Sequence, residues 1–278
     1  MLSVTFHGVR GGTPQCSDAV RRYGGNTACV VLESPHQPPI VLDAGTGLSA
    51  WAREAAGDGP LRATVLVSHL HLGHVQGLPS VVGSAEPPVR FDLFGPTPDE
   101  APLSEVLARA LSPPLFPAAG RALEEMTVHE LCDEELTVGE ARVTARSVPH
   151  EGPTNGYRVD WGGASVAYVS DHLAPDDGCS VAEAVLELAD GVDLLIHDAH
   201  HAPGEAHAWR RGHSPADYAV VVAREAGARR VALFHHAPGR SDEEVDGLLE
   251  HARRLGARLG VDEVMAAAEG LTVCFGGE

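Results

Sequence analysis

A short apolar run in the first third of the chain leads directly into a group of histidines. Residues 63–67, Ala-Thr-Val-Leu-Val, have the length and the β-branched content of a buried strand. His69, His71 and His74 follow, at offsets of two and three. A turn that leaves a strand with this spacing brings several imidazoles to one place, and neutral imidazole is the commonest side-chain metal ligand near pH 7. The stretch therefore predicts a metal-binding turn at a strand end.

Other histidines and an aspartate follow apolar runs in the same way. Side chains at strand ends gather at one rim of a sheet, where binding and catalytic sites accumulate. Nitrogen and carboxylate donors without cysteine suit Zn²⁺, Mn²⁺ or Fe²⁺. The pattern thus predicts one metal centre built from several strand ends. Its further members are His150 after residues 143–148, Asp171 and His172 after 165–169, and His235 and His236 after 230–234.

The order of the apolar runs predicts an α/β protein. Strand patterns come first, strands then alternate with helical patterns, and the second half repeats this coarse order. No linker splits the chain, and hydrophobic residues make up 44% of it, which suffices for a full core. We therefore expect one domain over residues 1–278, in which two sheets pack face to face with helices outside.

Three short sequences in the second half predict helix starts. Residues 180–183, Ser-Val-Ala-Glu, and 241–244, Ser-Asp-Glu-Glu, have the capping-box pattern, in which a serine and a later glutamate satisfy free N–H groups. Pro215 stands where the first residue of a third helix is expected, a position that proline favours. The helix after residue 241 is expected to run to about residue 255.

Composition restricts the partners and the compartment. A net charge of −19 repels phosphate backbones and disfavours nucleic acid, but a small anionic substrate is compatible because a bound metal supplies local positive charge. The chain lacks the roughly 20 apolar residues of a membrane span, and its N-terminus does not resemble a signal peptide. The 5 cysteines are scattered without a C-x-x-C pair, which favours reduced thiols and a cytoplasmic location. The oligomeric state stays open, a homodimer included.

Several segments together resemble the metallo-β-lactamase-fold hydrolases, in the branch that holds cyclic phosphodiesterases and the tRNA 3′-end endonuclease. The resemblance covers nearly the whole chain. It implies a four-layer αββα sandwich with two metal ions at the rim of the sheets. The segments that carry it are residues 8–14 (GVRGGTP), 23–27 (YGGNT), 43–47 (DAGTG), 212–214 (GHS) and 233–236 (LFHH).

The resemblance also implies a ligand set. Asp171 matches the carboxylate that bridges both metals. His235 is preferred to His236 because it comes first after its strand, although the reverse assignment stays open. Zn²⁺ is the expected metal, as one ion or two, with Mn²⁺ and Fe²⁺ as alternatives. The matching histidines are His69, His71 and His150 for the first metal, and His74 and His235 for the second.

Four positions outside the ligand set have expected roles. Asp43 matches a buried acid near the site, and is either the partner of a ligand histidine or a turn aspartate. His213 matches a histidine that binds phosphate or protonates the leaving group, and a helix N-terminus beside it would favour an anion; the alternative is a solvated loop histidine. His200 and His201 are expected at the mouth of the site and not as ligands. Three other histidines are expected at the surface: His129, His207 and His251.

One position departs from the family pattern His-x-His-x-Asp-His. Gly73 stands where the aspartate would ligate the second metal and position the attacking water, and glycine can do neither. Leu72 also replaces the aromatic residue common in near relatives. A second metal can still bind through three protein ligands and water. A one-metal site is the second outcome, and the third is replacement of the aspartate by another group, with His172 and Gln76 nearest in sequence.

The leading hypothesis is a metal-dependent hydrolase of a small phosphodiester, cyclic ones included, or of a related ester. A metal-bound hydroxide would attack, Asp171 would hold the metals and orient the hydroxide, and His213 would serve the phosphate or the leaving group. The acidic charge and the absence of a basic insertion disfavour tRNA processing. Two alternatives stay open because of Gly73. One is a lactonase, a thioesterase or an iron-dependent biosynthetic enzyme on the same fold, and the other is a catalytically impaired metal-binding homologue.

Overall fold

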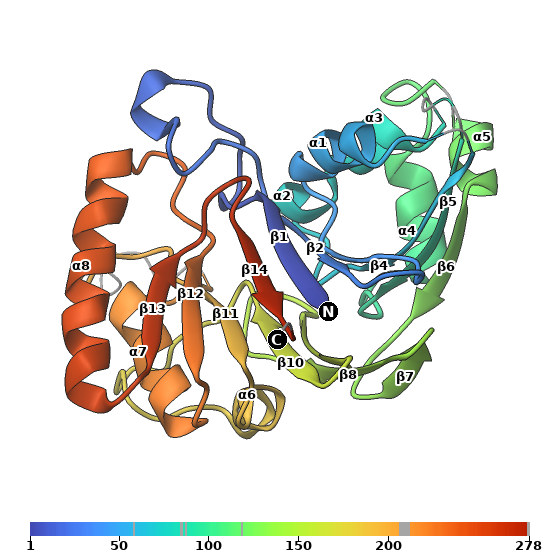
Figure 1. The fold of residues 1–278 in the computed structure, drawn as a ribbon. Helices are drawn as coiled ribbons and strands as arrows, with labels where there is room; N and C mark the ends of the chain where they lie inside the picture. The colour runs from blue at the N-terminus through green and yellow to red at the C-terminus, as the bar shows by residue number, and fades with distance from the viewer. Residues whose placement is uncertain (58, 84–85, 87, 118, 206–211, 277–278) are drawn as a thin grey trace.

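Two β-sheets lie face to face in the middle of the molecule, and helices cover their outer sides (Figure 1). The computed structural model describes residues 1–278 except 58, 84–85, 87, 118, 206–211 and 277–278. Across the first sheet the strands are β14 (Thr272–Phe275), β1 (Leu2–Gly8), β2 (Cys29–Glu33), β3 (Ile40–Leu42), β4 (Leu61–Leu66), β5 (Val89–Gly95) and β6 (Met126–Glu130). Across the second they are β13 (Glu263–Ala266), β12 (Arg230–Phe234), β11 (Leu194–Asp198), β10 (Ala164–Val169), β9 (Asn155–Trp161), β8 (Ala141–Ser147) and β7 (Glu135–Val138).

One apolar core fills the space between the sheets. Strand β1 alternates buried and half-buried residues, so that Val4 and Phe6 point inward as a two-residue period requires. They meet Tyr157, Val166 and Phe234 of the second sheet in one cluster. The rings of Phe6 and Phe234 lie 6.1 Å apart across the interface. This shared core supports the interpretation of residues 1–278 as one domain, which stays a prediction.

The helices form the two outer layers. Trp51 and Leu107 pack with Val65 and Phe91 on the outer side of the first sheet, and a separate apolar cluster covers the outer side of the second. The predicted αββα sandwich is therefore confirmed. The helices over the first sheet are α1 (Gly47–Glu54), α2 (Leu72–Val75), α3 (Leu78–Val81), α4 (Leu103–Ala110) and α5 (Ala119–Glu124). Those over the second are α6 (Glu183–Ala189), α7 (Ala216–Glu225) and α8 (Asp242–Leu259).

The helix starts are only partly as predicted. Ser241 caps α8 through the full capping box, as expected, although the helix continues to Leu259 because a left-handed glycine ends it only at residue 260. The prediction at residues 180–183 was wrong: α6 begins at Glu183, and its N-cap Ala182 has no hydroxyl to offer. Pro215 is the N-cap of α7 and not its first residue.

Parallel pairing brings the predicted site residues to one rim. Strands β3 to β6 are parallel neighbours, and so are β10 to β13. The carboxyl ends of parallel strands lie at the same edge of a sheet, where sites form. The residues that follow β3, β4, β10, β11 and β12 therefore converge. Among the described helices, none has the length and apolar character needed to cross a bilayer.

Candidate metal centre

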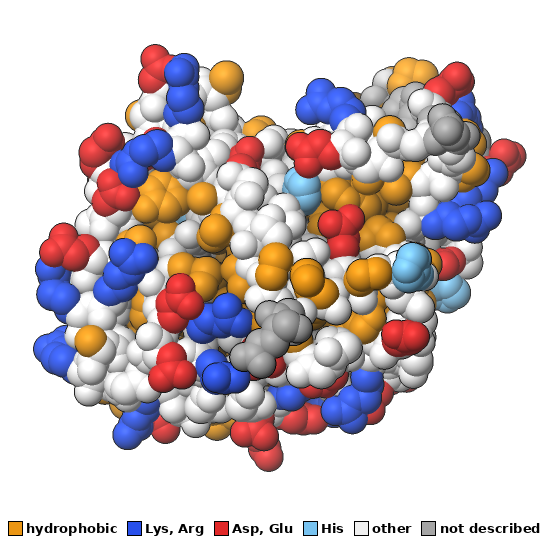
Figure 2. Space-filling model, in the orientation of Figure 1, with side chains coloured by type: hydrophobic (Ala, Val, Ile, Leu, Met, Phe, Trp, Pro, Cys, Tyr) orange, Lys and Arg blue, Asp and Glu red, His pale blue; other side chains and the backbone are white. Residues whose placement is uncertain are grey.

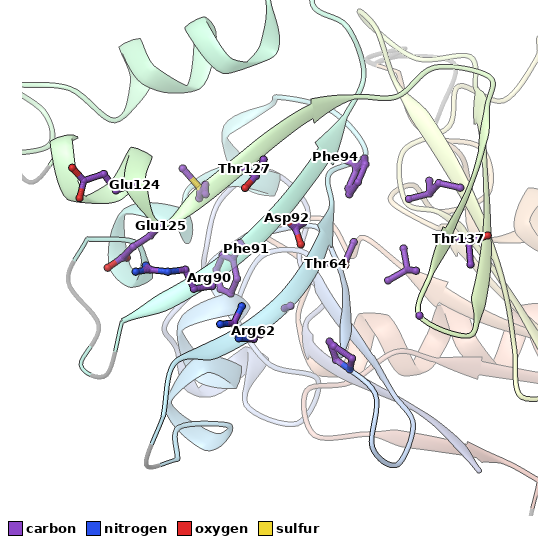
Figure 3. A pocket seen from close by; sticks show the side chains of 16 residues that line it. Arg62, Thr64, Arg90, Phe91, Asp92, Phe94, Glu124, Glu125, Thr127 and Thr137 are labelled. Carbon is purple, nitrogen blue, oxygen red and sulfur yellow. The ribbon is translucent and has the colours of Figure 1, made fainter.

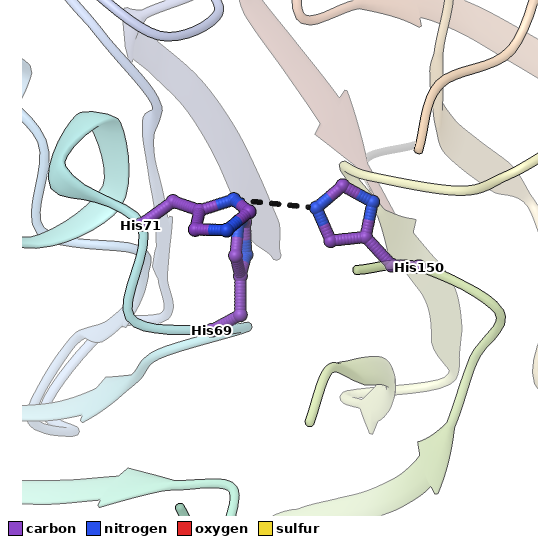
Figure 4. A group of neighbouring side chains, drawn as sticks. All are labelled: His69, His71 and His150. Carbon is purple, nitrogen blue, oxygen red and sulfur yellow. Dashed lines mark hydrogen bonds between the residues drawn. The ribbon is translucent and has the colours of Figure 1, made fainter. Parts of the chain in front are cut away.

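The first group of histidines joins two distant parts of the chain. His69 and His71 follow β4, whereas His150 follows β8 in the second sheet, and the three rings face one another (Figure 4). One nitrogen from each ring lies within 4.8 Å of the others, and His71 Nδ1 is 3.4 Å from His150 Nε2. The Nδ1 of His150 donates to the carbonyl of Gly212 at 2.6 Å, which turns its Nε2 toward the group. This arrangement suits a divalent cation.

Asp171, the second residue after β10, lies between the first group and a second pair of histidines. Its Oδ1 is 3.8 Å from His69 Nε2 and 3.7 Å from His150 Nε2. Its Oδ2 is 3.2 Å from His74 Nε2, and its Oδ1 is 3.4 Å from His235 Nε2. The carboxylate thus faces both groups, which is the geometry a bridging ligand needs.

Two buried polar atoms in these groups lack a hydrogen-bond partner, which supports the binding of cations here. His69 Nε2 and Asp171 Oδ2 are buried and have no hydrogen-bond partner. Buried polar atoms are normally satisfied, and leaving one without a partner costs about 1–3 kcal/mol. A cation bound between the two histidine groups would remove this cost. The donor set of imidazoles and one carboxylate, without cysteine, suits Zn²⁺.

The structure distinguishes the two histidines after β12. His235 has a φ of 57° and directs its Nε2 to Asp171 and to His74 Nε2, which is 3.3 Å away. His236 points the other way, and its Nε2 donates to the carbonyl of Ala267 at 2.9 Å. The geometry therefore brings His235 into the centre and leaves His236 in the core.

Asp43 holds His74, a member of the second histidine pair (His74 and His235), through its Nδ1. It is fully buried, and its Oδ2 accepts hydrogen bonds from His74 Nδ1 at 2.6 Å, Tyr168 Oη at 2.6 Å and Ser68 Oγ at 2.9 Å. Burial alone lowers the pKa of His74, but the carboxylates of Asp171 and Asp43 outweigh it and raise the pKa to about 9. Asp43 also has a φ of 62°, so it is both a turn aspartate and the partner of His74.

Replacing Asp43 by asparagine should weaken cation binding at His74. Asparagine tolerates a positive φ, so the backbone is retained while the charge behind His74 is lost. We expect an affinity about 10–100-fold lower for the cation on His74. Competition with a chelator, followed by titration of Zn²⁺ into the purified variant, measures this. Tyr168→Phe is the matched control, because it removes another bond to the same carboxylate without touching His74; equal losses in both variants would contradict the assignment.

His213 is held beside the centre by a carboxylate that the sequence analysis did not single out. Its Nδ1 lies 2.9 Å from Asp198 Oδ2 and 3.6 Å from Asp171 Oδ1. Burial alone lowers the pKa of His213, but the carboxylates of Asp198 and Asp171 outweigh it and raise the pKa to about 8. Asp198 ends β11 and also accepts the backbone N–H groups of His172 and Ser214. Its position at a strand end on the same rim was the signal that could have identified it.

His200 lies closer to the centre than expected. Its ring is nearly parallel to that of His213, with centroids 4.4 Å apart and an angle of 12°. One nitrogen each of His200, His213 and His235 lies within 4.8 Å of the others. His201, expected beside it at the mouth, is half-buried and lies outside this group. Of the histidines expected at the surface, His129 is exposed, His251 is half-buried and His207 lies outside the described residues.

The two groups proposed to fill the place of the missing aspartate are engaged elsewhere. His172 directs its Nδ1 to His197 Nε2 at 3.0 Å. Gln76 donates its amide to Thr27 Oγ1 at 3.1 Å and to the carbonyl of Gly12 at 3.5 Å. These contacts point both side chains away from the histidine groups.

Gly73 is in tight contact with the loop that follows β1. A Cβ atom at residue 73 would lie 2.8 Å from the carbonyl oxygen of Gly12 and 3.1 Å from its nitrogen. Such short contacts require the backbone to move. Gly11 is packed just as closely on the other side, since a Cβ there would lie 2.5 Å from His235 Cε1 and 3.0 Å from His200 Nδ1. The loop therefore fills the space next to residue 73.

Two small cavities open beside the histidines. One of about 230 Å³ is bordered by His69, His71 and Glu151, and another of about 190 Å³ by His213 and Tyr218. A third cavity, of about 490 Å³, lies between strands β4 to β6 and the turn after β7, and none of the histidines described above lines it (Figure 3). Of the cavities lined by described residues, these two small ones adjoin the candidate site.

Comparison with known sequences identifies relatives along most of the chain. Residues 39–236 match the family described as "Beta-lactamase superfamily domain". The chain is 31% identical over 238 residues to the uncharacterized protein Rv1339 of Mycobacterium tuberculosis, covering 83% of this chain and 81% of that protein. It is 29% identical over 287 residues to ribonuclease Z of Metallosphaera sedula, covering 92% of this chain and 94% of the relative.

Comparison with solved structures agrees on the fold. The metallo-β-lactamase fold protein YhfI from Bacillus subtilis superposes with a TM-score of 0.72 at 18% identity, over 98% of this chain and 99% of its own. A diphosphatase from the PhnP family gives 0.68 at 20% identity, over 99% and 98%. Human tRNase Z, short form, gives 0.67 at 20% identity, over 98% of each chain. The chain therefore belongs to the beta-lactamase superfamily and has the metallo-β-lactamase fold.

Proposed function

We propose that this protein is a metal-dependent hydrolase of small, anionic phosphodiesters, cyclic ones included. The observation that carries the proposal is the position of Asp171 between the two histidine groups, with the His213–Asp198 pair beside it. Relatives named ribonuclease Z and a fold neighbour named a diphosphatase support phosphate ester chemistry.

The residues divide into two ligand groups that share Asp171. His69, His71 and His150 would hold one divalent cation, and His74 and His235 the other. Zn²⁺ suits this donor set best. When bound, such cations supply a hydroxide at neutral pH and positive charge for the phosphoryl oxygens.

His213 would donate a proton to the leaving group. Because Asp198 occupies its Nδ1 side at 2.9 Å, the proton for transfer is carried at Nε2. The buried carboxylate of Asp198 stabilises the protonated imidazole and fixes its orientation, as in other oriented acid–base pairs. Asp198 itself is held by backbone N–H groups, which keep it ionised.

The size and charge of the substrate follow from the surroundings. Cavities of about 230 and 190 Å³ beside the histidines fit a small molecule better than a polymer. Acidic and basic side chains are interspersed on the face shown in Figure 2, and the chain as a whole carries a net charge of −19. This net negative charge favours a small anion held by the centre over a long phosphate backbone.

The test compares two leaving groups. The Zn²⁺- or Mn²⁺-loaded protein should hydrolyse bis(p-nitrophenyl) phosphate and a cyclic nucleotide, and a chelator should abolish both activities. In His213→Ala we expect kcat for the cyclic nucleotide to fall by roughly 10²–10⁴-fold, because its alkoxide leaving group needs a proton. Hydrolysis of the p-nitrophenyl ester should fall far less, because p-nitrophenolate leaves without protonation.

Two results would contradict the proposal. If no loaded form hydrolyses either ester, the protein is not a phosphodiesterase. If His213→Ala lowers both rates equally while the metal content is unchanged, His213 is not the proton donor. His201→Ala is the matched control, because it removes a neighbouring histidine that lies outside the ligand groups.

A further inference from the structure

A tetrahedral cation site uses four donors, and the second histidine pair, His74 and His235, offers fewer even with Asp171. His74, His235 and Asp171 supply three protein ligands. Residue 73 cannot supply a fourth, because the backbone of Gly12 already lies where its side chain would begin. Gln76 is bonded to Thr27 and to the same loop. An additional ligand must therefore come from another strand end.

Two further histidines, His200 and His213, lie close to His235, and His200 meets the geometric requirement of a ligand. It follows β11, and its backbone N–H donates to Asp198 Oδ1 at 3.0 Å, which fixes the start of the side chain. Its ring lies 5.5 Å from that of His235, and its ligand nitrogen is within 4.8 Å of the corresponding nitrogen of His235. Two nitrogens bound to one Zn²⁺ at about 2.1 Å lie up to about 4 Å apart, so a small rotation brings both to one ion.

The hydrogen bonds of His200 point to the same role. Its Nδ1 is buried and has no hydrogen-bond partner, a costly state for an imidazole nitrogen in a protein interior. His213 has a different role in the proposed function, in which Asp198 holds its Nδ1 at 2.9 Å and its Nε2 carries the proton for transfer. The rings of His200 and His213 stack at 4.4 Å, and the ring of His200 lies 5.5 Å from that of His235.

We infer that His200 is a ligand of the second cation and completes a coordination shell of His74, His200, His235 and Asp171. This inference rests on the metal centre of the proposed function. Three imidazoles and one shared carboxylate make this position rich in nitrogen, which favours Zn²⁺ and Co²⁺ over Mn²⁺. The shell also carries one negative charge from the protein, so the loaded centre attracts an anionic substrate strongly.

The experiment counts cations and measures their affinity without using activity. The purified protein is stripped with a chelator and titrated with Co²⁺, while calorimetry and the visible absorption of the bound ion are recorded. The wild type should bind two ions per chain. His200→Ala should bind the first normally and the second at least about 100-fold more weakly, because a direct ligand costs more than an outer partner. His201→Ala, the neighbour outside the ligand groups, should behave as the wild type.

Each result bears on the inference. If His200→Ala binds two ions as tightly as the wild type, His200 is not a ligand. If the wild type binds a single ion, there is no second position for His200 to complete, although the proposed hydrolase could still act with one ion. If the wild type binds none, the proposed function fails as well. His200→Gln guards against misfolding of the alanine variant: a folded glutamine variant with the same selective loss supports the inference, and one with both ions intact overturns it.

Discussion

Asp171→Ala is expected to lower phosphodiester hydrolysis by about three orders of magnitude or more, the largest effect of any single substitution in this chain. The carboxylate faces four histidines at 3.2–3.8 Å and is the group shared by both ligand sets. Its loss removes a ligand from each cation, and a cation contributes several kcal/mol of charge stabilisation, where each 1.36 kcal/mol is a tenfold change in rate.

The same variant should lose the stabilisation that cations give the fold. A ligand at 100 times its Kd stabilises the native state by about 2.7 kcal/mol, so Zn²⁺ should raise the Tm of the wild type measurably. In Asp171→Ala this rise should be largely absent. Without cations the variant should be close to the wild type in stability, because burial raises the pKa of Asp171 and the carboxylate is poorly accommodated in the empty cluster.

Differential scanning fluorimetry with and without Zn²⁺, together with steady-state kinetics, measures both effects. Asp262→Ala is a suitable control, since Asp262 is an exposed residue between α8 and β13. If Asp171→Ala keeps its activity and its Zn²⁺-dependent rise in Tm, Asp171 does not bridge the two groups. The assignment of both ligand sets would then have to be abandoned.

Much of the fold, and the convergence of these histidines and Asp171 at one rim, was predictable because it is encoded locally. An apolar run followed within two residues by His69 or by Asp171 predicts both a strand and the polar side chain at its end. Parallel strands then bring such ends to one rim without further information from the sequence. This is why residues as far apart as His69 and His235 could be assigned to one centre before their distances were known.

What the sequence did not reveal depends on contacts between distant segments. Asp198 is the last residue of β11. Its position at a strand end was its only local signal, and its contact with His213 arises only in the fold. His200 lies near His235 and stacks on His213, two residues that distant segments of the chain contribute. The predicted capping box at residues 180–183 does not form, since α6 begins two residues later than that pattern requires, with Ala182 as its N-cap.

Gly73→Asp is the second substitution with a large expected effect, and the structure predicts the opposite of a restored site. A Cβ at residue 73 would lie 2.8 Å from the carbonyl oxygen of Gly12. The loop after β1 would have to shift, and with it Gly11, which is packed on His235 and His200. We therefore expect weaker, not stronger, binding of the second cation, measured by the same Co²⁺ titration.

The variant should also be less stable. Overpacking typically costs about 1–3 kcal/mol, whereas replacing a helical glycine regains at most about 1 kcal/mol, so a net loss remains. For a chain of this size each kcal/mol shifts the Tm by about 2–4 °C, so a decrease of several degrees is expected. Gly73→Ala separates the causes, since it adds the same Cβ without a carboxylate and should lose nearly as much stability.

The comparison of these two variants decides what Gly73 means for the centre. If both lose stability and the aspartate gains no cation affinity, the glycine is required by the loop, and the coordination of the second cation has been rebuilt around other residues. If Gly73→Asp instead binds the second cation more tightly and raises the Tm, the loop yields easily and the centre is an incomplete form of a two-metal site. The contacts of the loop predict the first result. Gly12 lies against residue 73, and its neighbour Gly11 is packed on His235 and His200, so a shift of the loop disturbs these histidines.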